Sequence, residues 1–197
     1  MTKEVRGFAE MRWLNPPPSH SVGSDGVLLA CSGAKTDFWQ GTFYGFQRDS
    51  GHALMRPVPP EFTATLTFEA DYTTLYDQAG LMLRAGPSGW IKFGVEFTDG
   101  APHLSVVVTD GMSDWSTQRL ALDGPVTVRM TRLGAAILLH HADPAGPQGW
   151  SLARLAPFRG ASGGLAVGPY LCSPERAGLE ARFSDFRLGD PVSRDLH

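Results

Sequence analysis

Apolar and polar residues alternate with a period of two along most of the chain. In one segment Phe62, Ala64 and Leu66 are apolar, and the residues between them are threonines. Successive side chains of a β-strand point to opposite faces of its sheet, so such a segment has one apolar face for a core and one mixed face. No window carries an apolar stripe at helical spacing over three turns. The pattern predicts an all-β chain with little or no helix.

Turn signals separate short segments of this kind along the chain. Asp99–Gly100 is typical of a hairpin turn, Gly134 suits a tight reversal, and Gly86–Gly89 connects two apolar runs. Asp143–Pro147 predicts a longer surface loop. Strands that recur in this way predict two stacked antiparallel sheets whose apolar faces enclose the core. The expected strands are Val27–Cys31, Thr42–Arg48, Ala53–Met55, Phe62–Ala70, Ala79–Arg84, Trp90–Phe97, Leu104–Thr109, Ser116–Leu120, Val126–Leu133, Ala136–His141, Ser151–Ala156, Gly164–Tyr170 and Ala181–Leu188.

The composition is that of an ordinary globular chain. Of the 197 residues, 42% are hydrophobic and 19% are charged, which excludes a disordered protein. A β-sandwich of this length is usually one domain, so residues 1–197 are expected to form a single unit. The net charge of -3 gives no bulk attraction to nucleic acid or to an anionic membrane. We therefore expect neither as a partner.

The N-terminus and the two cysteines bear on the compartment. No apolar run follows Met1–Arg6, so no signal peptide is expected, and no run is long enough to span a bilayer. We therefore predict a cytoplasmic protein. Cys31 and Cys172 could form a bridge, but two cysteines are not a secreted disulfide framework. Buried free thiols are the favoured interpretation.

The segment Trp90–Phe97 carries the strongest functional signal. One face of the expected strand carries Trp90, Lys92, Gly94 and Glu96. The residues between them are all apolar and point to the opposite face. An aromatic ring, a cation, a gap and a carboxylate on one face are typical of the floor of a polar groove. The competing interpretation is a solvated sheet face on which Lys92 and Glu96 only pair with cross-strand neighbours.

Neighbouring strands can add further polar groups to this groove. Gln78, Arg84 and Thr109 are the candidates, with Ser105 as an alternative to Thr109. Amides and charged groups bind sugar hydroxyls, and an aromatic face packs on the C–H surface of a sugar ring. Trp90 follows a turn directly, so a place in the core or at the rim is equally open for it.

The loop before the Gln78 strand supplies two more candidates, Tyr76 and Asp77. The Asp77 carboxylate is expected either to cap that loop or to join Lys92 in a polar cluster. Capping is the favoured interpretation. Tyr76 is a further candidate for contact with a ligand.

Two tryptophans follow turn carboxylates in the same way. Asp37 precedes Trp39, and Asp114 precedes Trp115. In the favoured interpretation the carboxylates accept backbone N–H groups while the rings plug the ends of the sandwich. The alternative has Trp39 and Trp115 flank the groove mouth as stacking platforms.

Motifs for metals and nucleophiles are weak. The histidines show no metal-binding spacing, and Asp110 and Asp114 around Gly111 lack the spacing of a calcium loop. We expect no metal and no cofactor. Gly160–Gly164 fits the Gly-x-Ser-x-Gly pattern, but a strand is expected after it where that motif needs a helix. Ser162 is therefore not expected to be catalytic.

Five short sequence words occur in one order along the chain: Thr36–Trp39, Tyr76–Leu81, Trp90–Glu96, Ser113–Ser116 and Gly168–Pro174. Together they closely resemble the regulation-of-enolase protein family, within the concanavalin A-like lectin/glucanase superfamily. The resemblance runs from about residue 13 to residue 188. It implies a jelly-roll sandwich of two curved antiparallel sheets with a ligand on the concave face. It implies no catalytic mechanism.

Three functions follow as hypotheses. The first is a non-catalytic, lectin-like domain whose polar groove binds a carbohydrate or polyol. The second is a glycan-active hydrolase or lyase that uses Glu96 with a groove partner. The third is a protein-interaction module that regulates a metabolic enzyme, as the name of the family suggests. This third function would need a large exposed apolar patch.

The hydrolase hypothesis finds little support in the residues. Glycosidases use two carboxylates roughly 5–9.5 Å apart. Glucanases of this fold tend to place them on one strand as Glu-x-Asp-x-x-Glu, and that word is absent. Lys92 is expected to lower the pKa of Glu96, whereas general-acid work needs a raised pKa. A lyase would need Lys92 or Tyr76 as its base and Arg84 as a neutralising group.

Overall fold

The structure is a computed structural model that describes residues 4–160 and 164–192. It consists of strands joined by turns, so the all-β fold expected from the alternation is confirmed. In these two ranges, helical structure is confined to one 3-10 turn at Pro147–Gly149, which overlaps the end of the expected Asp143–Pro147 loop. Ser162 lies outside the described residues.

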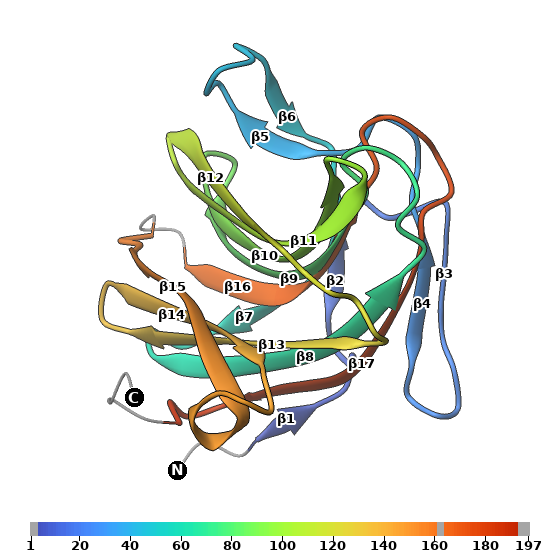
Figure 1. The fold of residues 1–197 in the computed structure, drawn as a ribbon. Helices are drawn as coiled ribbons and strands as arrows, with labels where there is room; N and C mark the ends of the chain where they lie inside the picture. Colours follow the sequence, from blue (N-terminus) through green and yellow to red (C-terminus); the bar gives the residue numbers. More distant parts are fainter. Residues whose placement is uncertain (1–3, 161–163, 193–197) are drawn as a thin grey trace.

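Two large antiparallel sheets and a separate hairpin make up the fold (Figure 1). The first sheet has eight strands in the order β15-β14-β13-β8-β17-β4-β3, and β1 also pairs with β17. These strands are β15 (Trp150–Pro157), β14 (Ala136–Ala142), β13 (Val126–Leu133), β8 (Phe62–Ala70), β17 (Glu180–Gly189), β4 (Leu28–Cys31), β3 (Ser19–Val22) and β1 (Val5–Arg6).

The second sheet has seven strands in the order β12-β11-β10-β9-β16-β7-β2. These strands are β12 (Met112–Arg119), β11 (Ala101–Asp110), β10 (Gly89–Thr98), β9 (Gln78–Gly86), β16 (Leu165–Cys172), β7 (His52–Val58) and β2 (Arg12–Leu14). The hairpin pairs β5 (Phe38–Gln40) with β6 (Gln47–Asp49).

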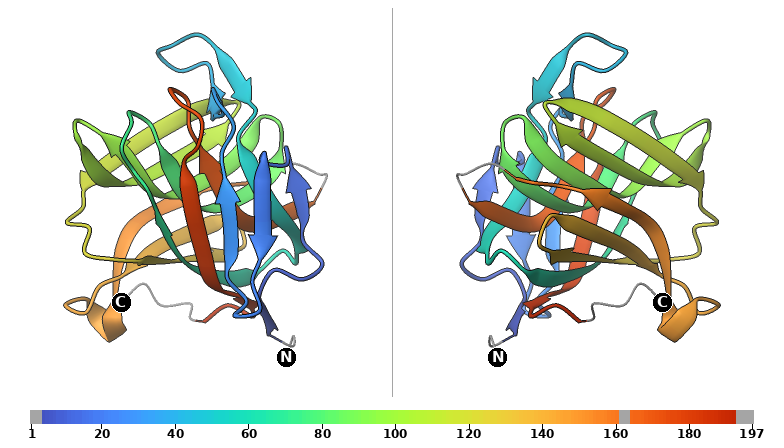
Figure 2. Two further views of the ribbon diagram at one scale, coloured as in Figure 1. Left: turned by 90° about the vertical axis from the view of Figure 1, so that its right-hand side faces the viewer. Right: turned by 90° about the vertical axis from the view of Figure 1, so that its left-hand side faces the viewer.

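The seven-stranded sheet is the middle layer of the molecule (Figures 1 and 2). One of its faces packs on the eight-stranded sheet, and its hollow face opens toward the β5–β6 hairpin. Two curved, stacked antiparallel sheets are the jelly-roll sandwich that the family resemblance implies. The hollow face is therefore the place to look for a site.

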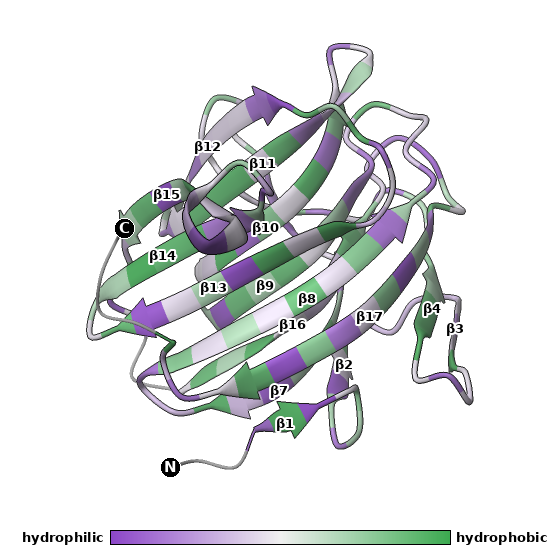
Figure 3. Cartoon of the chain, turned by 60° about the horizontal axis from the view of Figure 1, so that its bottom comes forward, coloured by the Kyte–Doolittle hydropathy of each residue, from purple (hydrophilic) through white to green (hydrophobic). Residues whose placement is uncertain are grey.

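Strand alternation explains the core between the two sheets. Figure 3 shows hydrophobic and hydrophilic residues alternating along strands of the eight-stranded sheet. Phe62 and Leu66 from β8 meet Leu81 from β9 and Phe93 from β10, and all four are fully buried. Each such side chain contributes about 1.5–3 kcal/mol relative to an exposed one. This burial fixes which face of β9 and β10 remains for the hollow side.

A second, smaller apolar cluster lies on the hollow face. Phe38 of β5 packs on Trp90 of β10 with ring centroids 5.9 Å apart, and Met82 and Tyr170 belong to the same cluster. Trp90 is fully buried. Of the places left open for Trp90, the core is therefore the one found. Phe38 covers the ring, so the ring does not line the groove. The cluster also seats the hairpin on the sheet.

The expected strand Thr42–Arg48 is wrong over residues 42–46, and only Gln47 and Arg48 belong to a strand, β6. Gly41, Phe43 and Gly45 have φ angles of 65°, 60° and 71°, and this left-handed backbone forms the turn of the hairpin. β8 and β13 begin and end at the predicted residues. The sequence pattern missed β1, β2, β3 and β5, which have at most four residues each and so show little alternation.

In the part of the chain that the structure describes, the two cysteines form no disulfide bond. Cys31 and Cys172 are both free thiols, as favoured, and Cys172 is the buried one. Across the described ranges, no helix has the length and apolar character needed to cross a membrane.

Candidate functional site

A pocket of about 250 Å³ opens on the hollow face of the seven-stranded sheet. The hairpin region, the strands β9 to β12, and the loops before β9 and after β16 all contribute to its lining. The lining residues are Asp37, Trp39, Tyr44, Phe46, Tyr76, Gln78, Lys92, Glu96, Val107, Trp115, Pro174 and Glu175.

Strand parity brings Lys92 and Glu96 into this pocket together. Both lie on β10 and are nearly fully buried, with 2% and 5% exposure. Gln78 lies directly opposite Glu96 on β9. The prediction that these three side chains share the hollow face is confirmed by their common place in the pocket lining.

A pair of glycines keeps the floor between the two charged residues bare. Gly94 lies between Lys92 and Glu96 on β10 and pairs with Gly80 on β9. A Cβ atom at Gly94 would lie only 2.2 Å from the carbonyl oxygen of Ala79. The two backbones approach too closely for a side chain at this point. The floor between the ammonium and the carboxylate therefore stays open.

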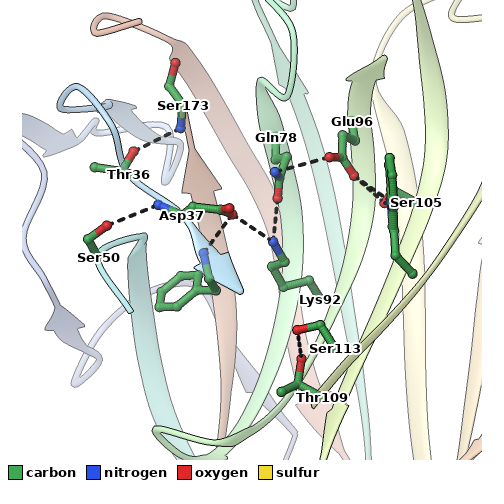
Figure 4. Close-up of polar contacts among 12 residues, drawn as sticks. Thr36, Asp37, Ser50, Gln78, Lys92, Glu96, Ser105, Thr109, Ser113 and Ser173 are labelled. Carbon is green, nitrogen blue, oxygen red and sulfur yellow. Dashed lines mark hydrogen bonds and ion pairs between the residues drawn. The ribbon is translucent and has the colours of Figure 1, made fainter. Parts of the chain in front are cut away.

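A continuous chain of hydrogen bonds joins the floor groups (Figure 4). Lys92 Nζ donates to Gln78 Oε1 at 2.8 Å, and Gln78 Nε2 donates to Glu96 Oε1 at 3.3 Å. Ser105 Oγ and Trp115 Nε1 donate to Glu96 Oε2 at 2.7 and 3.0 Å. The Gln78 amide thus separates the ammonium from the carboxylate and orients both.

The carboxylate partner of Lys92 is Asp37, which lies just before β5. Its Oδ1 is 3.2 Å from Lys92 Nζ and also accepts the Phe38 N–H at 2.8 Å. Burial by itself lowers the pKa of Lys92, but Asp37 and other neighbouring acidic groups outweigh burial and raise that pKa above its ordinary value. Lys92 is therefore a charged ammonium at neutral pH.

Burial also governs the protonation of Glu96. Burial raises the pKa of this carboxyl, the Lys92 charge and the Ser105 hydrogen bond lower it, and the net shift is upward. Lys92 therefore lowers the pKa of Glu96, as expected, but this effect does not set the net shift, which is upward. The reason is that the carboxyl is almost fully removed from water, which outweighs the attraction of the ammonium.

Aromatic rings form the walls above this floor. Trp39 and Trp115 pack edge to face, with centroids 6.4 Å apart and planes at 89°. Tyr44 packs against Trp39 at 5.7 Å, and Tyr76 packs against Trp115 at 6.2 Å. Both tryptophans therefore line the groove, which was the alternative to the favoured end-plug interpretation.

Asp77 caps its own loop, as favoured. Its Oδ2 accepts two backbone N–H groups, of Thr73 and Thr74, at 3.1 and 3.0 Å. Arg176 forms an ion pair with the same oxygen at 2.7 Å. The alternative of a cluster with Lys92 is wrong, because this buried carboxylate is already satisfied in its own loop.

Arg84 and Thr109 are two more candidates that lie outside the pocket lining. Arg84 forms two hydrogen bonds of 2.8 Å with Asp49 of β6 and so ties the hairpin to β9. Thr109 is fully buried and hydrogen-bonds Ser113 at 2.8 Å. Their expected place in the groove does not hold, because each side chain is engaged in holding neighbouring elements together.

Sequence reasoning names six of the twelve lining residues as groove candidates and misses the other six, which are Asp37, Tyr44, Phe46, Val107, Pro174 and Glu175. Tyr44 and Phe46 lie within the expected strand Thr42–Arg48, where the structure has the hairpin turn, and Glu175 directly follows the sequence word Gly168–Pro174. Asp37 was expected only to accept backbone N–H groups, which it does. Its place in the same sequence word as Trp39 is the signal that could have suggested a groove role.

Asp110 and Asp114 do not share a loop, because Asp110 ends β11 and Asp114 lies within β12. Asp114 pairs with Arg154 at 2.7 Å. Over residues 4–160 and 164–192, no three or more His, Cys, Asp or Glu side chains gather in a group that could hold a metal ion.

A larger groove of about 810 Å³ lies over the edge of the eight-stranded sheet near β3, β4 and β17. The polar residues that line it, such as His20, Glu69 and Arg182, are exposed or half-buried. No buried polar group is directed into it, unlike the floor at Lys92 and Glu96. The smaller pocket is therefore the better candidate site.

The fold and this pocket define a concanavalin A-like β-sandwich protein with a polar pocket on its hollow face. The chain belongs to the family described as "Protein of unknown function (DUF1349)", which matches residues 13–191. It is similar to "Regulation of enolase protein 1" of Saccharomyces cerevisiae, with 41% identity over 186 residues, or 94% of this chain and 92% of that relative. The family resemblance seen in the sequence words is thereby confirmed.

Solved structures agree on the fold. A functionally unknown protein from Saccharomyces cerevisiae superposes with a TM-score of 0.87 and 38% identity, covering 95% of this chain and all (100%) of that one. Lectin I-B4 from Griffonia simplicifolia superposes with a TM-score of 0.58 and 14% identity, covering 97% of this chain and 100% of the lectin. The likeness to the lectin shows the shared fold alone.

Proposed function

We propose that the hollow-face pocket binds a carbohydrate or other polyol without catalysing a reaction on it. One observation carries this proposal: a buried chain of ammonium, amide and carboxylate, from Lys92 through Gln78 to Glu96, forms the floor beneath aromatic walls. An ammonium has three donors, and Asp37 and Gln78 use two of them. The third is free to donate to a ligand hydroxyl.

The walls suit the other face of such a ligand. Sugar rings present C–H surfaces that pack on aromatic faces, and Trp39 and Trp115 supply such faces next to the polar floor. The pocket volume of about 250 Å³ suits one small ring and excludes a large ligand. A small polar ring with hydroxyls on one side meets both demands.

A glycan array followed by thermal-shift titration tests the proposal. A true ligand at a hundredfold excess over its Kd should stabilise the wild-type protein by about 2.7 kcal/mol. Lys92→Met and Glu96→Gln should lose most of this stabilisation. Glu69→Gln, which alters the larger groove, should keep it. A ligand that stabilises both pocket variants as well as wild type would refute binding at this site.

A second candidate is a glycan-active enzyme, and the raised pKa of Glu96 favours it. A carboxyl with a raised pKa suits a general acid. Lys92 and Asp37 line the same pocket as Glu96 and form an ion pair at 3.2 Å. Turnover of aryl glycosides that is lost in Glu96→Gln would establish this function, while binding without turnover would leave the lectin-like one.

A protein-interaction role has one observation of its own. The hairpin turn exposes Phe43, Tyr44 and Phe46, with 94%, 42% and 36% exposure. The similar yeast protein is named for regulation of enolase. Pull-down with purified enolase, compared between wild type and Phe43→Ser, tests this role. The cytoplasmic location expected from the sequence stays a prediction.

A further inference from the structure

The aromatic walls of the pocket close into a ring of four side chains. Trp39 contacts Tyr44 and Trp115, and Trp115 contacts Tyr76, with interplanar angles of 70°, 89° and 73°. The circle is completed by the Tyr44 and Tyr76 hydroxyls, which lie 2.9 Å apart. A cation is attracted to the face of an aromatic ring within about 6 Å of its centroid, so four rings grouped around one space offer several such positions.

The charges around this ring have the same preference. Three carboxylates line the pocket, from Asp37, Glu96 and Glu175, against the single ammonium of Lys92. Asp37 neutralises that ammonium at 3.2 Å. Glu96 and Glu175 are left over, and within the described residues no ion pair is formed by either.

Tyr76 reports the field at the pocket mouth. Its hydrogen bond with Tyr44 raises its pKa to about 12, with burial and the charges of Tyr44, Glu96 and Glu175 acting in the same direction. Glu96 and Glu175 are the smallest of these causes, but both act at the Tyr76 hydroxyl as negative charges. A cation beside the tyrosine pair would be attracted by the same two carboxylates.

We propose that the pocket selects an amino sugar, whose ammonium lies in the ring of four aromatic side chains beside Glu96 and Glu175 and whose hydroxyls bind Lys92 and Gln78. This inference rests on the proposed polyol-binding function and narrows its ligand class. A neutral sugar would satisfy the floor but leave the aromatic ring and the carboxylates without a counter-charge. A simple ammonium ion would satisfy the ring but leave the Lys92–Gln78 floor unused.

Calorimetric titration of the full chain with matched ligands tests the inference. The ligands are glucosamine, N-acetylglucosamine, glucose and tetramethylammonium, measured at a pH at which the glucosamine amine is protonated. Acetylation removes the charge and keeps the ring. We expect glucosamine to bind about tenfold more tightly than N-acetylglucosamine and glucose, and more tightly than tetramethylammonium. Added salt should weaken glucosamine binding more than glucose binding.

One substitution separates charge selection from sugar binding. Glu175 is exposed, so Glu175→Gln should fold normally. It should reduce the preference for glucosamine over glucose several-fold. The matched control is Glu180→Gln, an exposed residue on the eight-stranded sheet, which should leave the preference unchanged.

The possible failures are distinguishable. Equal affinity for glucosamine and glucose would overturn the amino-sugar assignment and leave the proposed function standing. Binding of tetramethylammonium as tight as that of glucosamine would overturn the role of the hydroxyls, and with it both proposals. Absence of binding by all four ligands, and by longer oligomers of the same sugars, would also overturn both.

Discussion

Lys92 on the floor of the seven-stranded sheet and Asp37 at the base of the hairpin form an ion pair of 3.2 Å across 55 positions of the chain. Among the ion pairs of the described residues, it is the one that joins the hairpin region to β10. The other ion pair of the hairpin, Asp49 with Arg84, reaches β9. The pair of Lys92 and Asp37 holds the pocket wall against its floor. The side chains are 3% and 14% exposed, so solvent screens the attraction only weakly.

Asp37→Ala should destabilise the protein by about 3 kcal/mol, because it leaves a buried ammonium without its counter-charge. Chemical denaturation at neutral pH measures the loss. Asp114→Ala is the matched control, since its pair with Arg154 is more exposed. We expect the control to change the free energy of unfolding by at most about 1 kcal/mol.

The double variant Asp37→Ala/Lys92→Met separates the ion pair from simple packing. Removal of both charges should restore part of the stability that Asp37→Ala loses. The comparison also needs the single variant Lys92→Met. If the double variant lost more unfolding free energy than the two single variants lose together, the unpaired buried charge would not be the cause.

Gly94→Ala should destabilise the protein by about 2 kcal/mol, because the added Cβ would meet the Ala79 carbonyl oxygen at 2.2 Å. To accommodate the Cβ, β9 and β10 would have to move apart at the centre of the pocket floor, which costs free energy of folding. Gly89→Ala is the control at the start of the same strand. Its Cβ would meet its nearest neighbour, Ala85 Cβ, at 3.7 Å, an ordinary contact. Equal stability losses in the two variants would contradict the close-approach argument.

The floor of the site was predictable because a strand has a strict period of two. Once Ile91 and Phe93 are assigned to the core, Lys92 and Glu96 have to emerge on the other face. Long alternating strands such as β8 were predictable for the same reason. These inferences need only residues close together in the sequence.

The walls were predictable only in part: Trp39, Trp115 and Tyr76 were candidates, but the contacts of Trp39 and Tyr44 depend on a hairpin that packs on another element. β5 has three consecutive buried residues, Phe38, Trp39 and Gln40, so it shows no alternation. The burial of Trp90 is set by Phe38, and the partner of Lys92 is set by Asp37. Each of these contacts joins residues about fifty positions apart, and nothing local in either segment specifies its partner.

His52 makes stability depend on pH near the base of the hairpin. Its Nε2 accepts the Gly33 N–H at 3.0 Å, so Nδ1 carries the proton and donates to the Asn15 carbonyl at 2.7 Å. Burial lowers the pKa of His52 and outweighs the hydrogen bond to Asn15, which raises it. The stability that depends on neutral His52 is therefore complete above its ordinary value of 6.5 and is lost as the pH falls through the lowered value.

Denaturation of wild type and His52→Gln between pH 7.5 and 5 measures this effect. This range extends about one unit above and about 1.5 units below the ordinary histidine pKa. Wild type should lose stability on acidification more steeply than the variant. The pKa of His140 is also lowered by burial, so His52→Gln/His140→Gln should show a still smaller loss. Parallel curves for all three proteins would rule out both histidines as the source.

Protonation of Glu96 should change stability in the opposite direction from protonation of His52. The folded pKa of Glu96 lies above the ordinary value of 4.5, so the folded state binds the proton more tightly than the unfolded chain does. Wild type should therefore gain stability relative to Glu96→Gln as the pH falls from neutral toward 4.5. Gln can keep the hydrogen bonds from Trp115 and Ser105 through its amide oxygen, but its NH2 group then faces the Gln78 NH2 group and loses that hydrogen bond. This loss does not depend on pH, so the slope of the difference with pH reports the titration of Glu96. The difference in unfolding free energy between wild type and Glu96→Gln, measured at several pH values, gives the answer. A difference that is constant with pH would mean that Glu96 titrates as an ordinary exposed carboxyl, and that burial does not control the charge on the pocket floor.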